Sequence, residues 1–171
     1  RQRLLCVNDR RGWASFAKTH NPRVRGMLLQ DKVVIVTGAG GGLGAGIARV
    51  CAREGAKVIV ADVRGDAAQD VAGSLPGAMG VACDLRIDAA LDALVAVTVE
   101  QYGHIDGLVN NAGANFSKPF LETSEEDWDW VISLDLRAIF FLTQKVCRQM
   151  LAQGGGGSVV NISSVHSQSC L

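Results

Sequence analysis

The chain has 171 residues, which suits a single domain, and its 17 basic residues balance 17 acidic ones. This balance argues against nucleic acid or another polyanion as a general partner, and no apolar run is long enough to span a membrane. Five scattered cysteines, without paired or metal-type spacing, predict free thiols, no metal site and a reducing, cytoplasmic location.

Residues 1–26 differ in composition from the rest of the chain. They contain one acid, Asp9, against a set of basic residues: Arg1, Arg3, Arg10, Arg11, Lys18, Arg23 and Arg25. This composition is compatible with an organellar transit segment, but the chain does not begin with Met, so upstream translated or expression-derived sequence is an equal alternative. We predict a disordered basic extension over 1–26 and a folded domain over 27–171.

Residues 32–62 have the pattern of one strand–helix–strand unit. Residues 33–36 form a short run of β-branched side chains, typical of a buried parallel strand, and 57–62 repeat that pattern. Between them a glycine-rich turn leads into a helical pattern that ends at Gly55, a residue suited to cap a helix. The apolar residues at helical spacing are Leu43, Ile47, Val50 and Cys51. The unit predicts two parallel strands joined by a right-handed crossover.

The glycines of this turn have a chemical use. A turn without Cβ atoms lets a pyrophosphate approach the backbone, and the helix behind it aims free N–H groups at the phosphates. Asp62 ends the second strand, where a carboxylate accepts hydrogen bonds from the adenosine ribose hydroxyls. Glycine also marks ordinary turns, but strand, glycines, helix, strand and acid in this register favour dinucleotide binding.

Asp62 also bears on which dinucleotide binds. Its carboxylate repels the 2′-phosphate of NADP, and no basic side chain stands among the glycines to attract that phosphate. Arg64 is the only cation nearby, and we expect it to lie in solvent. NAD is therefore the predicted cofactor, ahead of NADP.

The rest of the chain continues to alternate strands and helices. The predicted elements are a weak helix over 65–73, a strand over 78–83, a helix over 88–102 closed by Gly103, a strand over 105–109, a long helix from a capping box at Thr123 and Ser124 to Ala152, and a strand over 158–162. This order predicts an α/β fold of the Rossmann type, a doubly wound parallel sheet with strand order 3-2-1-4-5.

The long helix is apolar on nearly every side through its middle. The apolar residues are Val131, Ile132, Leu134, Leu136, Ala138, Ile139, Phe140, Phe141 and Leu142. A helix of this kind must be covered on two sides. One side packs on the sheet, and the other needs a further helix of the same subunit or a partner subunit. We expect a homo-oligomer that uses this helix.

Short motifs follow the predicted strands in order. They are Thr37-Gly38-x-x-x-Gly42-x-Gly44, Asp62, Asp84-Leu85, Asn110-Asn111-Ala112-Gly113 and Ser163-Ser164. With these motifs in this order, the chain resembles the short-chain dehydrogenase/reductase family from about residue 28 to its end. The resemblance implies a Rossmann-type sheet of seven strands in dimers or tetramers. It also implies that the domain over 27–171 binds NAD and lacks its last strands.

The resemblance implies a cofactor site. Its cofactor-binding residues are Thr37, Gly38, Gly42, Leu43, Gly44, Asp62, Asp84, Leu85, Asn111, Ala112 and Gly113. The glycines shape the turn around the pyrophosphate. Asp84 accepts a hydrogen bond from the adenine amine and Leu85 packs on its ring, while the last three residues lie beside the nicotinamide ribose. Without the resemblance, a helix cap is the alternative role for Asp84.

Ser164 and Asp135 are the implied catalytic residues. Ser164 follows a central strand, where its hydroxyl can hydrogen-bond the substrate oxygen and stabilise developing charge. Asp135 stands at the place of an asparagine in the family's proton relay, and an aspartate accepts hydrogen bonds there but cannot donate as an amide does. We assign no role to the neighbouring Ser163 and His166.

The family's acid–base tyrosine, paired with a lysine, should follow Ser164 by about a dozen residues, past Leu171. The single tyrosine, Tyr102, precedes the fourth strand and cannot replace it. Family membership implies an enzyme that transfers hydride between NAD and a small secondary alcohol or ketone. For these 171 residues we expect no turnover. The alternative function is that of a catalytically inactive dinucleotide-binding fragment or a regulatory partner.

Overall fold

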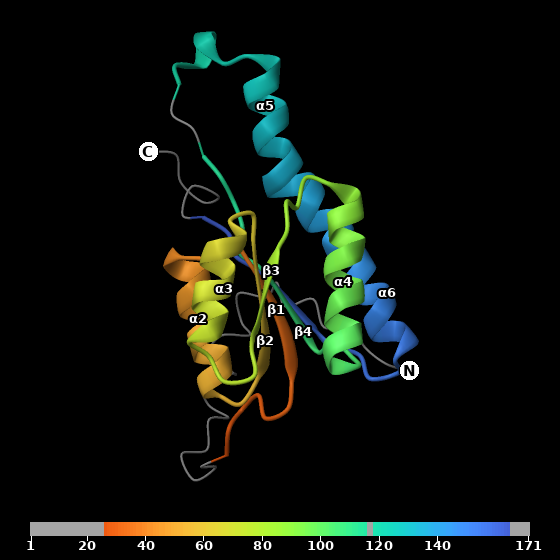
Figure 1. Cartoon of the computed structure of the whole chain (residues 1–171). Coiled ribbons are helices and arrows are strands. Elements are labelled where there is room, and N and C mark those ends of the chain that lie inside the picture. The colour runs from red at the N-terminus through yellow and green to blue at the C-terminus, as the bar shows by residue number, and fades with distance from the viewer. Residues whose placement is uncertain (1–25, 116–117, 165–171) are drawn as a thin grey trace, which may run out of the picture.

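The computed structural model describes residues 26–115 and 118–164 as a parallel sheet between two layers of helices (Figure 1). The sheet has five strands in the order β3-β2-β1-β4-β5, which confirms the predicted Rossmann-type topology. The strands are β1 (Val33–Thr37), β2 (Lys57–Asp62), β3 (Met79–Ala82), β4 (Gly107–Asn110) and β5 (Ser158–Asn161). The predicted disordered extension lies outside the described residues, apart from Gly26.

The helices divide between the two faces of the sheet (Figure 1). Helices α2 (Gly42–Arg53) and α3 (Gly65–Gly73) cover one face, and α4 (Asp88–Tyr102) and α6 (Ile139–Ala152) cover the other. Before α6 come a short 3₁₀-helix (Phe120–Glu122), helix α5 (Glu125–Ile132) and a π-helical segment (Ser133–Ala138). Within the described residues, no helix is long and apolar enough to cross a membrane.

Strand β1 shows why the first apolar run has no polar alternation. Val34 and Val36 pack into the cluster under α2 and α3, whereas Ile35 packs with residues of α4 and α6 on the other face. All five residues of the strand are buried. A strand covered on both faces favours consecutive apolar side chains, as the run from Val33 to Val36 predicted, and its last residue, Thr37, is polar but hydrogen-bonded.

Helix α2 is where the sequence predicts it, but its buried face differs from the apolar pattern. Leu43 is 64% and Val50 49% exposed. The buried residues are the small ones: Gly44, Ala45, Ala48 and Ala52. Small side chains let the helix backbone approach the sheet closely. Of the larger apolar residues, Ile47 and Cys51 pack against the edge of this buried cluster, whereas Leu43 and Val50 do not.

The predicted helix ends agree with the structure. Gly55 and Gly103 follow α2 and α4 with φ of 93° and 83°, backbone angles that favour glycine. Ser124 and Asp127 form a capping box at the start of α5. The predicted fourth strand is shorter at its start, because the amide of Ile105 hydrogen-bonds the Gln153 side chain and not a neighbouring strand.

The predicted long helix is continuous from α5 to α6 but changes to π geometry at 133–138. Helix α5 extends beyond the sheet, past the carboxyl ends of the strands (Figure 1). Further along, Ala138, Leu142, Val146 and Met150 are buried toward the sheet. Leu136 and Phe140, on the same helical run, are 61% and 60% exposed. One side of the helix is therefore covered by the sheet, and part of its apolar surface stays open.

Candidate functional site

The glycine turn between β1 and α2 is packed too closely for side chains. Gly38 has a φ of 62°, and a Cβ there would lie 2.8 Å from the Cα of Ala112. At Gly44 a Cβ would lie 2.3 Å from the carbonyl oxygen of Gly38. Gly42, with a φ of 53°, has no atom within 4 Å of its Cβ position. The turn is thus closely packed at Gly38 and Gly44 and open at Gly42.

Thr37 and Asn111 hold this turn against the end of β4. The Thr37 hydroxyl accepts hydrogen bonds from the amides of Asn111 (3.0 Å) and Ala112 (3.1 Å) and donates to the Val109 carbonyl (3.3 Å). The Asn111 side-chain amide donates to the carbonyls of Thr37 (2.9 Å) and Gly38 (3.2 Å). Thr37 is buried, so its side chain positions the turn and offers no exposed surface to a ligand.

Asp62 joins the end of β2 to the same turn. One carboxylate oxygen accepts a hydrogen bond from the Gly40 amide (2.9 Å), and the other accepts from the Arg64 amide (3.0 Å). The Arg64 side chain is 64% exposed, as expected, but it also pairs with Asp62, with Nε 3.5 Å from Oδ1. Its other end approaches Gly41. The lone solvated arginine predicted from the sequence is therefore a partner of the carboxylate.

Asp84 follows β3 and is held by Arg86. The Arg86 Nε and Nη2 donate to the two carboxylate oxygens at 2.9 and 2.6 Å. These side-chain hydrogen bonds, and less strongly the Arg86 amide and charge, lower the pKa of Asp84 against the opposing effect of burial. Asp84 is therefore ionised at neutral pH. Leu85, next in the chain, is mostly buried in the core under α4 and α6.

These groups surround one cavity of about 390 Å³ at the carboxyl edge of the sheet. Its lining includes seven predicted cofactor-binding residues: Gly38, Asp62, Asp84, Leu85, Asn111, Ala112 and Gly113. It also includes Arg64, Arg86, Trp130 and Leu134. Gly42, Leu43 and Gly44 form the first turn of α2 beside it. The structure thus brings together residues from the carboxyl ends of four strands, β1 to β4, which is where proteins of this fold bind nucleotides.

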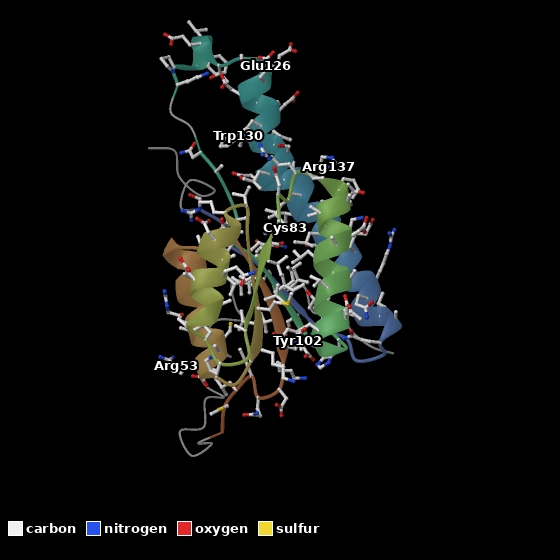
Figure 2. The ribbon with its side chains drawn as sticks, in the orientation of Figure 1. Arg53, Cys83, Tyr102, Glu126, Trp130 and Arg137 are labelled. Atoms are coloured by element: carbon white, nitrogen blue, oxygen red, sulfur yellow. The ribbon has the colours of Figure 1, made fainter. Side chains whose placement is uncertain are left out.

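Sequence reasoning missed Arg86 and Trp130. Arg86 had a usable signal, since an arginine two residues after a carboxylate can fold back onto it. Trp130 precedes Leu134 by one helical turn, so both side chains lie on one face of the helix leaving α5. Trp130 lies above the sheet in Figure 2, on the side toward which α5 extends.

Asp135 contacts the loop after β4. Its Oδ1 accepts a hydrogen bond from the Ala114 amide at 2.9 Å, and the same oxygen lies 3.5 Å from the Cβ position of Gly113. Asp135 belongs to the π-helical segment, a geometry that is frequent at functional sites. The aspartate therefore acts as an acceptor, the one role that its chemistry allows at the place of an amide.

Ser164 comes after β5, whose last residue, Asn161, pairs with Asn110 of β4. The parallel pairing puts it at the same edge of the sheet as the cavity. Ser164 is exposed and is not among the residues that line the cavity. His166 lies outside the described residues.

The thiol nearest the cavity is not activated. Burial, with a smaller contribution from the charge of Asp84, raises the pKa of Cys83 to about 11, so the thiol stays protonated at neutral pH. Cys83 lies in the middle of the molecule in Figure 2. Among the described residues, no group of His, Cys, Asp or Glu is arranged to hold a metal ion.

The fold is that of a Rossmann-type α/β protein, and its cavity lies at the carboxyl edge of the sheet, where proteins of this class bind nucleotides. The family profile of the short chain dehydrogenases matches residues 32–170, and the chain belongs to this family. The match covers all five strands, the glycine turn and the loops around the cavity.

Relatives with established names support the same family. The chain is 36% identical over 141 residues to 2-dehydro-3-deoxy-D-gluconate 5-dehydrogenase of Escherichia coli, covering 81% of this chain and 56% of that one. It is 40% identical over 147 residues to L-rhamnose 1-dehydrogenase (NAD(P)(+)) of Azotobacter vinelandii, covering 81% and 57%. The chain thus spans a little over half the length of these relatives.

A solved structure has the same fold. The 3-ketoacyl-(acyl-carrier-protein) reductase of Brucella melitensis, complexed with NADH, superimposes with a TM-score of 0.78 at 32% sequence identity. The match covers 82% of this chain and 60% of that protein. These proteins are named as dehydrogenases or reductases, and their similarity to the chain agrees with its membership of the short chain dehydrogenase family.

Proposed function

We propose that the protein is an NAD-dependent oxidoreductase that transfers hydride between a small secondary alcohol and the corresponding ketone. Family membership supports the reaction class, and the relative complexed with NADH supports a nicotinamide dinucleotide. The observation that carries the proposal is the Asp62 carboxylate. It is buried in the cavity, is hydrogen-bonded to the glycine turn, and faces the space where the adenosine ribose is expected.

The residues present fit such a cofactor. Helix α2 begins after Gly41, which supplies no side-chain cap, and its first turn contains no acid. Its N–H groups and the positive end of its dipole are therefore available to a pyrophosphate. Asp84 and Leu85 line the part of the cavity assigned to adenine. Asn111, Ala112 and Gly113 line the part assigned to the nicotinamide ribose.

The nicotinamide supplies the hydride acceptor or donor when it is bound. In the proposal, Ser164 hydrogen-bonds the substrate oxygen and stabilises the charge that develops on it. Asp135 fixes the backbone after β4 through its bond to Ala114 and so positions the loop that borders the reacting groups. We also propose a cytoplasmic location and a homo-oligomer that covers the exposed Leu136 and Phe140.

A second candidate is dinucleotide binding without turnover, as an inactive fragment or a regulatory partner. The observation that favours it concerns Tyr102. Its hydroxyl donates to the Gly77 carbonyl at 2.8 Å, near the amino ends of the strands, and Figure 2 shows it at the opposite end of the molecule from Trp130, which lines the cavity. Tyr102 therefore cannot move the substrate proton. NADH binding with no alcohol oxidation or ketone reduction across a substrate panel would favour this candidate over the enzyme.

The cofactor assignment is tested by titrating NADH and NADPH against the 171-residue chain, following nicotinamide fluorescence. We expect NADH to bind at least about tenfold more tightly, because the 2′-phosphate meets the Asp62 carboxylate. Asp62→Asn should reduce this preference. Asp66→Asn, an exposed acid at the start of α3 outside the cavity, is the matched control and should leave it unchanged. Tighter binding of NADPH by the unaltered chain would refute the assignment.

A further inference from the structure

The Asp84–Arg86 pair is the best-defined ion pair in the cavity wall. Two parallel hydrogen bonds join the guanidinium to the carboxylate, and the Arg86 amide donates a third at 3.1 Å. The two side chains are 23% and 38% exposed, and both line the cavity. By contrast, the Arg64 amide donates to Asp62 at 3.0 Å, but its guanidinium approaches that carboxylate only through Nε, at 3.5 Å. The fork geometry fixes the orientation of both Asp84 and Arg86.

Both Asp84 and Arg86 keep hydrogen-bonding groups that their mutual contacts do not occupy. An ionised carboxylate has about four lone-pair positions, two on each oxygen. Oδ1 of Asp84 already accepts from the Arg86 amide and Nε, while Oδ2 accepts only from Nη2. One acceptor position on Oδ2 therefore remains. Among described residues, the guanidinium makes no other hydrogen bond, so it keeps N–H donors next to that acceptor.

An acceptor beside a donor is the complement of the amino edge of adenine, which presents an N–H donor at N6 next to the acceptor N7. A purine with a 6-oxo group presents two acceptors there and leaves the carboxylate facing an oxygen. We propose that Arg86 is a specificity-determining residue: together with Asp84 it forms a donor–acceptor pair that selects the adenine edge of the dinucleotide. This inference rests on the proposed function, since it concerns the same cofactor.

Arg86 contributes twice in this arrangement. It holds the carboxylate, which lines the cavity, in one orientation. It also supplies the donor that Asp84 lacks, because a carboxylate only accepts. Leu85 lies between the two polar residues in the chain and lines the cavity beside them, which provides an apolar surface next to the polar pair.

The test compares reduced NAD with its hypoxanthine analogue, which carries a 6-oxo group in place of the 6-amine. Both are titrated against the full 171-residue chain by fluorescence, for the unaltered protein, Arg86→Met and Asp84→Asn. Arg53→Met, an exposed arginine in the last turn of α2, is the surface control. Arg64→Met is the cavity control on the ribose side. Thermal melts of each variant check that it is folded.

We expect the unaltered chain to bind NADH at least about tenfold more tightly than the analogue. Arg86→Met should reduce this ratio below about threefold, and Asp84→Asn should also reduce it, since an amide can donate to the 6-oxo group. Both arginine controls should keep the ratio. An unchanged ratio in Arg86→Met, or equal affinities in the unaltered chain, would overturn the inference and leave the proposed function standing. Failure of the folded chain to bind NADH at all would overturn the proposed function itself.

Discussion

The two edges of the sheet both gather charged and polar residues, but they use them differently. At the amino edge, Asp106 accepts hydrogen bonds from the Val33 amide (2.9 Å) and from Lys32 (3.0 Å), and it pairs with His104 at 2.9 Å. At the carboxyl edge, Asp62 and Asp84 bond to neighbouring backbone and arginines but also face a cavity of about 390 Å³.

Other polar side chains near the amino edge also join one element to another. The Gln153 side chain accepts from the Ile105 amide (3.1 Å) and donates to the Ile105 carbonyl (2.6 Å), which attaches the end of α6 to the start of β4. Tyr102 closes the end of α4 onto the loop before β3. The carboxylates of the two edges have similar numbers of partners, so what distinguishes Asp62 and Asp84 is that they line a cavity.

The parallel sheet explains this asymmetry. Helices that follow parallel strands begin at the carboxyl edge and end at the amino edge, so free N–H groups and positive dipole ends gather on one side only. The start of α2, with no side-chain cap, lies beside Asp62 and the glycine turn. If the two edges differ in function, substitutions at the carboxyl edge should change both NADH affinity and stability. Substitutions at the amino edge should change stability alone.

The largest effect is expected from Gly44→Ala. The new Cβ would lie 2.3 Å from the Gly38 carbonyl oxygen and 2.5 Å from the Asn111 side-chain nitrogen, so the turn and the helix must separate. We expect the free energy of unfolding to fall by roughly 3 kcal/mol, as in severe overpacking, and NADH binding to be lost. Urea denaturation and fluorescence titration measure the two effects.

Gly46→Ala is the matched control for this change. It lies in the same helix, and no atom approaches its Cβ position within 4 Å. Alanine there should raise the free energy of unfolding by up to about 1 kcal/mol through helix propensity, with NADH affinity unchanged. Equal destabilisation by both substitutions would mean that the close approach of the turn is not what requires glycine.

The next largest effect is expected from Asn111→Ala, with the adjacent Asn110→Ala as its control. Asn111→Ala removes the hydrogen bonds to the carbonyls of Thr37 and Gly38. It should lower the free energy of unfolding by about 2 kcal/mol and weaken NADH binding about tenfold. Asn110 donates instead to Thr143 (3.0 Å) and Asn161 (2.8 Å), away from the turn. Asn110→Ala should destabilise similarly with little change in affinity. A comparable loss of affinity in both variants would contradict the role of Asn111 in holding the turn.

Much of the fold was predictable because its signals are local. The apolar runs of β1 and β2, the glycine caps after α2 and α4 and the Ser124 capping box each depend on a few adjacent residues. Parallel pairing then places the residues after each strand at one edge. This is why Asp62, Asp84 and Asn111, which end or follow three different strands, line one cavity.

What was not predictable depends on contacts between distant segments. The buried face of α2 consists of small residues, of which Gly44 meets the turn at Gly38 and the alanines pack on the sheet, a fact that apolar spacing does not reveal. The π-helical turn around Asp135 coincides with a bond to Ala114, twenty-one residues earlier in the chain. The fork between Arg86 and Asp84 needed side-chain geometry to distinguish it from a solvated arginine.

The smallest effect is expected at the amino edge, from Asp106→Asn. Burial alone would raise the pKa of Asp106, but hydrogen bonds from Val33 and Lys32, with the charges of Lys32 and His104, lower it below its ordinary value. The unfolded chain has an aspartate pKa of about 3.9, so the stabilising contribution is complete above that value and is lost as pH falls through the lower folded-state pKa. The variant should lose about 1 kcal/mol at pH 7 and little at low pH.

Urea denaturation at a series of pH values measures this, with Asp70→Asn, an exposed acid of α3, as control. The unaltered protein should lose stability more steeply than Asp106→Asn as the solution is acidified below about pH 4. NADH affinity at pH 7 then tests whether the amino edge contributes to cofactor binding. If Asp106→Asn weakened NADH binding as much as Asn111→Ala does, the amino edge would be coupled to the cavity. The distinction between a structural amino edge and a cofactor-binding carboxyl edge would then be wrong, whatever the stability data showed.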